Sequence, residues 1–262
     1  MKNIICFSGG KDSTALILWA KENQMEFETV FCDTGWEHPL TYKFIGKINR
    51  ELLDGKLIIL KSKKYRGGMT TLVEARHRVP SIRARFCTEE LKIKPVLEYL
   101  KTINDEYQMF QGIRAEESIK RSKLKPKEWS DLHDCYINFP LLFLTAEEIF
   151  AIHKKYGIDP NPLYKLNSSR VGCYPCVLSG VGEFRRLDKQ KPNIWERAKM
   201  LEQLSNKSFF QTGTIPDRWC SKDFNGVKVP TVEDVQAYIR QWDGQQELFE
   251  TPACMSVYNL CE

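Results

Sequence analysis

The sequence predicts an α/β protein built on a parallel sheet of about five strands, with helices on both faces. Short apolar, β-branched runs alternate with helical patterns over residues 1–165, which is the order of βαβ units. A glycine turn joins the first run directly to the first helical pattern. Two further runs end in polar turns, as strands do at the ligand-binding edge of a parallel sheet.

The predicted strands cover residues 3–7, 27–33, 56–60, 107–112 and 135–142. Helices are predicted from Ser13, at 39–53, at 88–100, from Thr145 through Tyr156, at 192–204 and from Thr231 through Trp242. Thr145 and Thr231 each precede a carboxylate by three residues, which is the spacing of a capping box. Pro95 interrupts the 88–100 pattern, where it would kink a helix.

Two charged segments are predicted as loops. Residues 61–85 are basic, contain two adjacent glycines and show no clear period; they either close over an anionic substrate or form a solvated surface. Residues 119–134 are basic and hydrophilic. Prolines at 160 and 162, with polar residues after them, predict a boundary between an α/β domain of residues 1–165 and a mainly helical, cysteine-bearing region of residues 166–262.

The turn between the first strand and the first helix carries groups that bind phosphate. In order, the six residues are Ser8, Gly9, Gly10, Lys11, Asp12 and Ser13. The glycines let the backbone approach a phosphate, and the first-turn amides and the helix dipole favour an anion there. Lys11 adds a positive charge, and Asp12 is a candidate Mg²⁺ ligand. The turn is not a Walker A loop, which reads Gly-x4-Gly-Lys-Ser/Thr; its alternative is an ordinary βα turn.

Two more strand ends are predicted to face the same crevice, since parallel strands end at one edge of a sheet. Asp33, Thr34 and Gly35 follow the second strand, and Gly112 and Arg114 follow the fourth. Asp33 is a candidate for a second Mg²⁺ ligand or a ribose contact, against a simple turn aspartate. Arg114 can bind phosphate or sulfate with its forked guanidinium, against a surface arginine.

Composition excludes several classes of protein. With 42% hydrophobic and 28% charged residues, the chain is typical of a soluble globular protein, and no apolar run approaches the roughly 18 residues of a membrane helix. The N-terminus leads directly into a strand rather than a signal peptide, so we expect a cytoplasmic protein without a membrane partner. A net charge of +5 fits an anionic ligand but does not require nucleic acid.

Nine cysteines without a secretory signal favour metal binding or thiol chemistry over a disulfide framework. Cys173 and Cys176 form a C-x-x-C pair on a predicted turn, which suits two thiolates holding one metal centre. The alternatives are a redox thiol pair and inert cysteines. Further ligands would come from Cys87, at a helix start, and from Cys220, Cys254 or Cys261; Cys6, Cys32 and Cys135 lie in predicted strands and are expected in the core.

Four motifs in the first half of the chain resemble one protein family. Residues 7–13 are similar to the PP-loop of the N-type ATP pyrophosphatases, and residues 30–36 to the second motif of their sulfur-metabolism branch. That branch includes the phosphoadenosine phosphosulfate (PAPS) reductases and the catalytic subunit of ATP sulfurylase. Residues 87–95 and 112–118 resemble family segments in the same order. Residues 170–176 are similar to a stretch in members with an iron–sulfur cluster, including the sulfur-mobilising enzyme of DNA phosphorothioation.

The resemblance implies a Rossmann-like adenine nucleotide alpha hydrolase fold, with residues 1–165 binding the nucleotide. It implies that ATP and Mg²⁺ are bound, that residues 8–13 hold the pyrophosphate, and that an acceptor is adenylated at the α-phosphorus. The acceptor would be sulfate or a nucleic-acid phosphate. The expected catalytic residues are Lys11, Asp12 and Arg114, with Asp12 and Asp33 on Mg²⁺ and Thr34, Gly35 and Gly112 at the nucleotide.

The cysteine pattern implies a 4Fe-4S cluster held by Cys87, Cys173, Cys176 and Cys261, with Cys254 or Cys220 as the alternative fourth ligand. A sulfur or electron donor protein and a homo-oligomer are further expectations. PAPS reductases lack the intact Gly-Gly-Lys-Asp core, which this chain keeps, so the motif favours ATP. The alternatives are a thiol-dependent PAPS reductase with Cys261 as nucleophile, and a nucleotide-sensing or nucleic-acid-binding module without turnover.

Overall fold

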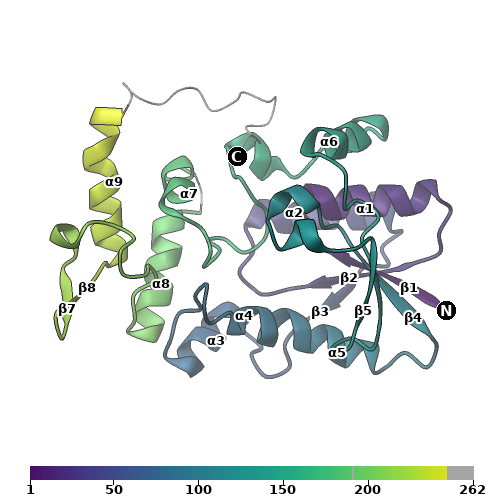
Figure 1. The fold of residues 1–262 in the computed structure, drawn as a ribbon, viewed down its shortest axis with the longest axis horizontal. Coiled ribbons are helices and arrows are strands. Elements are labelled where there is room, and N and C mark those ends of the chain that lie inside the picture. The colour runs from purple at the N-terminus through teal and green to yellow at the C-terminus, as the bar shows by residue number, and fades with distance from the viewer. Residues whose placement is uncertain (191, 247–262) are drawn as a thin grey trace.

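A computed structural model describes residues 1–190 and 192–246 and shows a six-stranded sheet with helices on both faces (Figure 1). The strand order is β3-β2-β1-β4-β6-β5. The strands are β1 (Lys2–Phe7), β2 (Glu28–Cys32), β3 (Ile58–Leu60), β4 (Tyr107–Gln111), β5 (Lys127–Ser130) and β6 (Cys135–Asn138). Every neighbouring pair is parallel except β5 with β6. The predicted α/β class and its five parallel strands are confirmed.

The strand β5 corrects the prediction of a loop over residues 119–134. It pairs antiparallel with β6 at the edge of the sheet, with Trp129 opposite Tyr136. Its side chains are exposed or half-buried, because a strand at the edge of the sheet needs little apolar surface. The sequence Lys-Glu-Trp-Ser therefore lacks the apolar alternation by which a strand is recognised.

Each face of the sheet has its own apolar core. The helices α1 (Lys11–Glu22), α2 (Pro39–Leu52) and α6 (Ala146–Lys155) cover the face to which Ile5 and Phe7 point. The helix α5 (Lys94–Leu100) covers the face of Ile4 and Met109. The capping box of Thr145 with Glu148 starts α6 as predicted. The carboxyl ends of β1, β2 and β4 are thereby held together at one edge of the sheet.

Pro95 does not break the predicted 88–100 helix. A helical stretch runs through α4 (Phe86–Thr88), a π-helical segment (Glu89–Ile93) and α5. The wider π turn comes just before the proline, which has no backbone N–H to give to the preceding turn. Glu90, with 3% of its surface exposed, binds Lys94 in α5 and Arg76 in α3 (Met69–Arg76).

The helix α3 lies inside residues 61–85, so the prediction of a structureless loop there is wrong. Met69, Leu72 and Val73 are buried at helical spacing. Only these three apolar residues mark a helix of two turns, and the charges around them hide the period.

The C-terminal region is mainly helical, as predicted, and contains an unpredicted hairpin. A 3-10 turn at Pro162–Leu166 leads into this region. The region has helices α7 (Val181–Arg186), α8 (Ile194–Ser205) and α9 (Val232–Gln246), a 3-10 turn at Asp217–Trp219, and strands β7 (Lys222–Phe224) and β8 (Val227–Val229). Thr231 and Asp234 exchange hydrogen bonds at the start of α9, as the predicted capping box requires.

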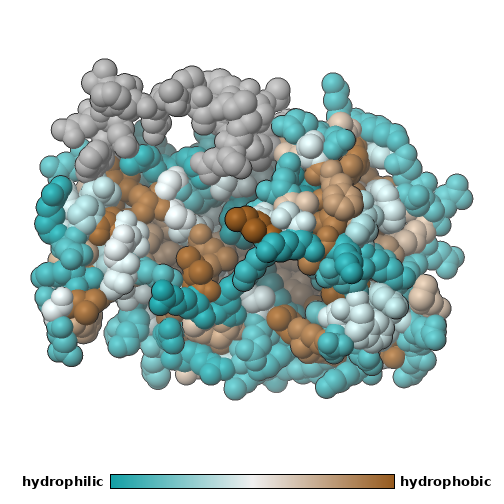
Figure 2. Space-filling view, in the orientation of Figure 1, coloured by the Kyte–Doolittle hydropathy of each residue, from teal (hydrophilic) through white to brown (hydrophobic). Residues whose placement is uncertain are grey.

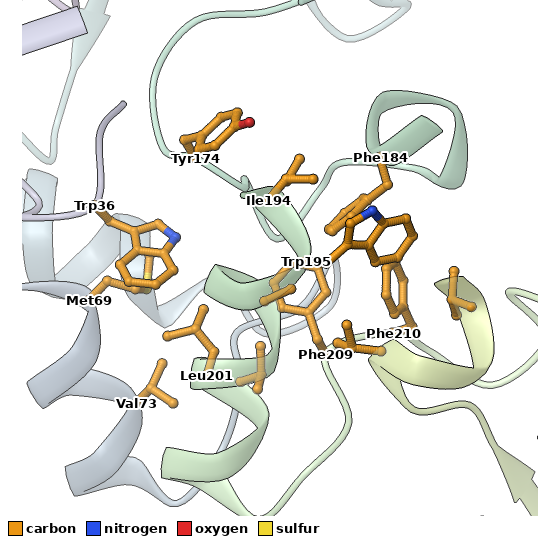
Figure 3. Packing of buried hydrophobic residues seen from close by; sticks show 14 of the residues in the cluster. Trp36, Met69, Val73, Tyr174, Phe184, Ile194, Trp195, Leu201, Phe209 and Phe210 are labelled. Atoms are coloured by element: carbon orange, nitrogen blue, oxygen red, sulfur yellow. The ribbon is translucent and has the colours of Figure 1, made fainter. Parts of the chain in front are cut away.

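This region shares a core with the first half of the chain, the third core of the protein. Phe184, Trp195 and Phe210 pack together, and the same cluster reaches Trp36 and Met69 (Figure 3). The division at residue 165 stays a prediction. No described helix is long and apolar enough to cross a membrane. Figure 2 shows a face on which hydrophilic residues dominate and apolar ones form separate patches.

Candidate functional site

The loop of residues 8–13 presents backbone N–H groups to an anion. Gly9 has a φ of +76°, and Gly10 is the N-cap of α1 without a side-chain cap. Among the described residues, the N–H groups of Gly9, Gly10, Asp12 and Ser13 have no protein acceptor. Hydroxyls of Ser8 and Ser13 lie 3.1 Å apart across the loop. This is the donor arrangement that binds phosphate at a helix N-terminus.

Residues far along the chain hold this loop in place, and sequence reasoning missed them. Asn161 is completely buried and donates to the Gly9 carbonyl at 3.0 Å. His153 lies 2.9 Å from the Lys11 carbonyl, and the Tyr164 hydroxyl accepts the Lys11 N–H at 3.2 Å. Burial lowers the pKa of His153 below its usual value. The prolines beside Asn161 indicate a domain boundary, and the sequence around these three residues gives no sign that they contact residues 9–11.

Lys11, Asp12 and Arg114 form one buried charge cluster. The Lys11 ammonium lies 3.0 Å from one Asp12 carboxylate oxygen, and the Arg114 Nε lies 2.5 Å from the other. Arg114 is 4% exposed and also pairs with Glu116. The structure thus brings the three predicted catalytic residues together from two strand ends. The Lys11 ammonium and the Arg114 guanidinium together neutralise the negative charge of the Asp12 carboxylate.

Gly112 lets the end of β4 touch the start of α1. A Cβ added at Gly112 would lie 2.7 Å from the Asp12 carbonyl oxygen and 3.0 Å from the Ser13 nitrogen. Both are backbone atoms and cannot rotate away. The predicted role of Gly112 at the nucleotide is therefore joined by a packing role that only glycine can fill.

Gly112→Ala is expected to weaken the binding of a phosphate or pyrophosphate anion at residues 8–13 about tenfold, because α1 must shift away from β4 and carry these residues with it. Overpacking of this kind costs about 1–3 kcal/mol, and 1.4 kcal/mol is tenfold in affinity. Calorimetric titration of the variant measures the effect. Gly180→Ala is the matched control, since a Cβ there meets nothing within 4 Å. Equal affinities of the two variants would contradict the packing role.

The loop after β2 holds a second acidic cluster. The Tyr42 hydroxyl lies 2.7 Å from Asp33 and 2.8 Å from Glu37, so two carboxylates share one phenol proton. Lys61 pairs with Asp33 at 2.9 Å, and the Gly35 N–H donates to Asp33. Burial alone would raise the pKa of Asp33, but the hydrogen bonds from Tyr42, Lys61 and Gly35 lower it. Asp33 is therefore a carboxylate near neutral pH.

The C-x-x-C turn is fastened to this same loop. Tyr174 N–H donates to the Trp36 carbonyl at 2.8 Å, and Trp36 Nε1 donates to the Pro175 carbonyl at 3.1 Å. Arg197 from α8 donates to both the Trp36 and the Tyr174 carbonyl oxygens. Thr34 lies 3.6 Å from the Cys173 sulfur. The C-x-x-C turn thus packs against the loop after β2 rather than forming a separate module.

One pocket beside this turn combines thiols with positive charges. It is lined by Cys87, Cys173 and Cys176 and by Arg85, Lys92 and Arg170. Burial raises the pKa of Cys173 to about 11. Cys87 lies in the first turn of α4, as predicted. The structure therefore brings three of the predicted ligands into one lining, from two segments that are far apart in the sequence.

The described residues contain no group of three His, Cys, Asp or Glu side chains placed to hold one metal ion. Cys220 caps the 3-10 turn before β7 and is absent from the pocket lining. Cys254 and Cys261 lie outside the described residues. Cys135 is buried in the core on the α5 face, and Cys6 and Cys32 are half-buried and pack against the same core.

Comparison with known proteins decides the family. The Phosphoadenosine phosphosulfate reductase domain family matches residues 2–179. The chain belongs to this family. The match runs from β1 through the C-x-x-C turn, and it indicates an enzyme that acts on a nucleotide. The predicted family is thereby confirmed.

The chain is also similar to two uncharacterized relatives and to one solved structure. A protein of Escherichia phage 186, named as an uncharacterized 37.8 kDa protein, is 29% identical over 99% of this chain and 96% of its own length. An uncharacterized protein of Methanocaldococcus jannaschii is 30% identical over 73% of this chain, which spans 45% of that relative. The structure of PAPS reductase from Candida auris has a TM-score of 0.56 and 15% identity, covering 67% of this chain and 83% of that one. This last likeness supports the Rossmann-like fold of the family.

Proposed function

We propose that the chain binds Mg-ATP and cleaves the bond between its α and β phosphates, adenylating an oxyanion acceptor in sulfur metabolism or modification. The observation that carries this proposal is the intact loop of residues 8–13, with its unpartnered N–H groups beside Lys11. The loop suits a pyrophosphate group. ATP contains one, whereas PAPS does not.

In the proposed reaction an acceptor oxygen attacks the α-phosphorus. The bond to the bridging oxygen breaks, and pyrophosphate leaves with the electron pair. Residues 8–13 hold the leaving pyrophosphate through N–H groups, hydroxyls and the Lys11 ammonium. Arg114, anchored on Asp12 at the end of β4, orients the acceptor. Catalysis comes from fixed charge and orientation, as in phosphoryl transfer generally.

Asp12 and Asp33 are the proposed Mg²⁺ ligands. Carboxylate oxygens at the mouth of a phosphate site are the donors that Mg²⁺ takes together with substrate phosphates. Asp12 pairs with Lys11 at 3.0 Å and with Arg114 at 2.5 Å, and Asp33 pairs with Lys61 at 2.9 Å. With Mg²⁺ bound to the two carboxylates, Lys11 and Lys61 would no longer be needed to neutralise them and could bind phosphate oxygens.

The test is pyrophosphate release from Mg-ATP with a panel of acceptors that includes sulfate and a single-stranded oligonucleotide. The oligonucleotide is included because Trp129 and Tyr136 are exposed and pack edge to face with ring centroids 5.1 Å apart, and the Lys127 ammonium lies 4.4 Å from the centroid of the Tyr136 ring. Exposed aromatic rings beside a positive charge suit bases and phosphates. Release with one acceptor supports the proposal. A parallel assay contains PAPS and thioredoxin as the thiol donor. Release of sulfite from PAPS, without release of pyrophosphate from ATP, would favour the thiol-dependent reductase instead.

A 4Fe-4S cluster is proposed in the pocket of Cys87, Cys173 and Cys176, with Cys261 as the fourth ligand and Cys254 or Cys220 as alternatives. The donor chemistry fits, since thiolates ligate such clusters and the Arg85, Lys92 and Arg170 cations offset their negative charge. When bound, the cluster would carry sulfur or electrons. The three thiols are not placed around one metal ion in the described residues, so the proposed cluster requires them to draw closer together and a fourth cysteine to join them.

Protein purified without oxygen is expected to be brown and to absorb near roughly 400 nm, as thiolate-ligated iron–sulfur clusters do. Cys173→Ser is expected to lose most of this absorbance. Cys220→Ser should keep it, because Cys220 is absent from the pocket lining. A colourless wild-type protein that holds zinc or no metal would contradict the cluster.

A further inference from the structure

Tyr164 lies outside the phosphate loop in sequence but next to it in space. Its ring is 3% exposed and sits in the 3-10 turn Pro162–Leu166, which Asn161 caps through the Leu163 N–H. The ring packs edge-on against Phe150 of α6, with centroids 6.2 Å apart, and the Lys11 ammonium lies 5.6 Å from its centroid. Packing on both sides therefore fixes where the hydroxyl points.

The Tyr164 hydroxyl points at the N-terminus of α1. It accepts the N–H of Lys11, the first residue of that helix, at 3.2 Å. A Cβ added at Gly10 would lie 3.5 Å from this hydroxyl and 3.5 Å from the Ser8 hydroxyl, so the two hydroxyls flank the same glycine. One of them belongs to the loop and the other reaches it from residue 164.

The proton of this hydroxyl has no acceptor among the described residues. The Lys11 N–H is the one hydrogen-bond partner of the hydroxyl in this part of the chain, and it is a donor. A phenol can donate one hydrogen bond as well as accept. Burial raises the pKa of Tyr164, so the proton stays on the oxygen. Leaving a buried donor unpaired costs about 1–3 kcal/mol, which an arriving acceptor would recover.

We propose that the Tyr164 hydroxyl donates a hydrogen bond to an oxygen of the phosphate group bound by residues 8–13. The hydroxyl accepts from the Lys11 amide and passes its own proton towards the anion, extending the donor set of the loop by one buried group. This inference rests on the proposed function, in which the anion is the pyrophosphate part of Mg-ATP.

The test is calorimetric titration of wild type and Tyr164→Phe with Mg-pyrophosphate and Mg-ATP. The variant keeps the ring and loses the proton, so its affinity for both ligands is expected to fall about 10- to 150-fold, as for one hydrogen bond to a charged group. Tyr156→Phe is the control, because its ring is 36% exposed on the surface and its affinity should be unchanged. A structural role alone would lower the melting temperature and leave the affinity of the folded protein unaltered.

The outcomes separate the two proposals. A wild-type protein that binds neither ligand overturns the proposed function. A wild type that binds them, with Tyr164→Phe binding equally well, overturns the role of Tyr164. If the phenylalanine variant does not fold, 3-fluorotyrosine at position 164 serves instead. Its fluorine resonance should shift on addition of Mg-pyrophosphate and stay in place with adenosine, and the absence of a shift in a protein that binds pyrophosphate would contradict the inference.

Discussion

Lys11→Ala is expected to slow pyrophosphate release from Mg-ATP by about 100-fold or more. The Lys11 side chain is 8% exposed and its ammonium lies 3.0 Å from Asp12, so its charge acts where little water can screen it. Losing one fixed donor to developing negative charge costs about 100- to 1,000-fold in rate. The measurement is the steady-state rate with the acceptor that supports turnover in the wild type.

The control for this variant is Lys21→Ala, in the last turn of the same helix. Alanine is the best helix former, so neither substitution weakens α1 through its backbone. Circular dichroism and thermal unfolding establish that both variants are folded. A Lys11→Ala rate within threefold of the Lys21→Ala rate would remove Lys11 from the proposed catalytic set.

Gly68→Ala is expected to lower the free energy of unfolding by about 3 kcal/mol or more. A Cβ there would lie 1.9 Å from the Thr34 carbonyl oxygen, and Gly68 has a φ of +69° and a ψ of −132°, a conformation that only glycine adopts at low cost. The Thr34 carbonyl also accepts the Met69 N–H at the start of α3. Avoiding the clash would separate α3 from the loop after β2. Chemical denaturation measures the change.

Gly213→Ala serves as its comparison. Gly213 has a φ of +78°, and a Cβ added there would meet nothing within 4 Å. Gly213→Ala therefore costs only the free energy of holding alanine at positive φ, about 1 kcal/mol, with no clash. The difference between the two variants isolates the clash. If both lose the same free energy, the close approach of Gly68 to Thr34 does not stabilise the fold.

The phosphate loop could be predicted from sequence because its chemistry is local. A strand, two glycines and a helix start fix the direction of the backbone N–H groups within six residues, whatever the rest of the chain does. The juxtaposition of Asp12 with Arg114 followed from a single rule, that parallel strands end at one edge. Both features depend on short-range geometry and sheet topology, which the residue pattern reveals.

The supports of the loop could not be predicted in this way. Residues 9–11 are contacted by Asn161, His153 and Tyr164, which lie more than 140 positions later in the sequence. Their local pattern of prolines and aromatic residues is equally typical of a connecting segment. Only the packing of the 3-10 turn against α1 and α6 gives them a role, and packing between distant segments leaves no periodic trace in a single sequence.

The segments α3 and β5 were missed for a different reason. Their apolar residues are few because each element is short, and the basic residues around them match a solvated loop equally well. The pocket of Cys87, Cys173 and Cys176 could be predicted only in part. The types of ligand were predictable from the C-x-x-C pair, whereas the clamp of Arg197 on the Trp36 and Tyr174 carbonyls, which sets their position, was not.

The shared third core has a consequence for the synthesis of this protein. Trp36, Leu72 and Val73 share one buried cluster with Trp195, Phe210 and Val235, which come much later in the chain. At a translation rate of roughly 5–20 residues per second, the ribosome needs on the order of ten seconds to pass from the first group to the second. During that interval the nascent chain carries an uncovered apolar surface beside its nucleotide site. Mutations that slow the closure of this core are therefore expected to lower the yield of folded protein before they lower its activity.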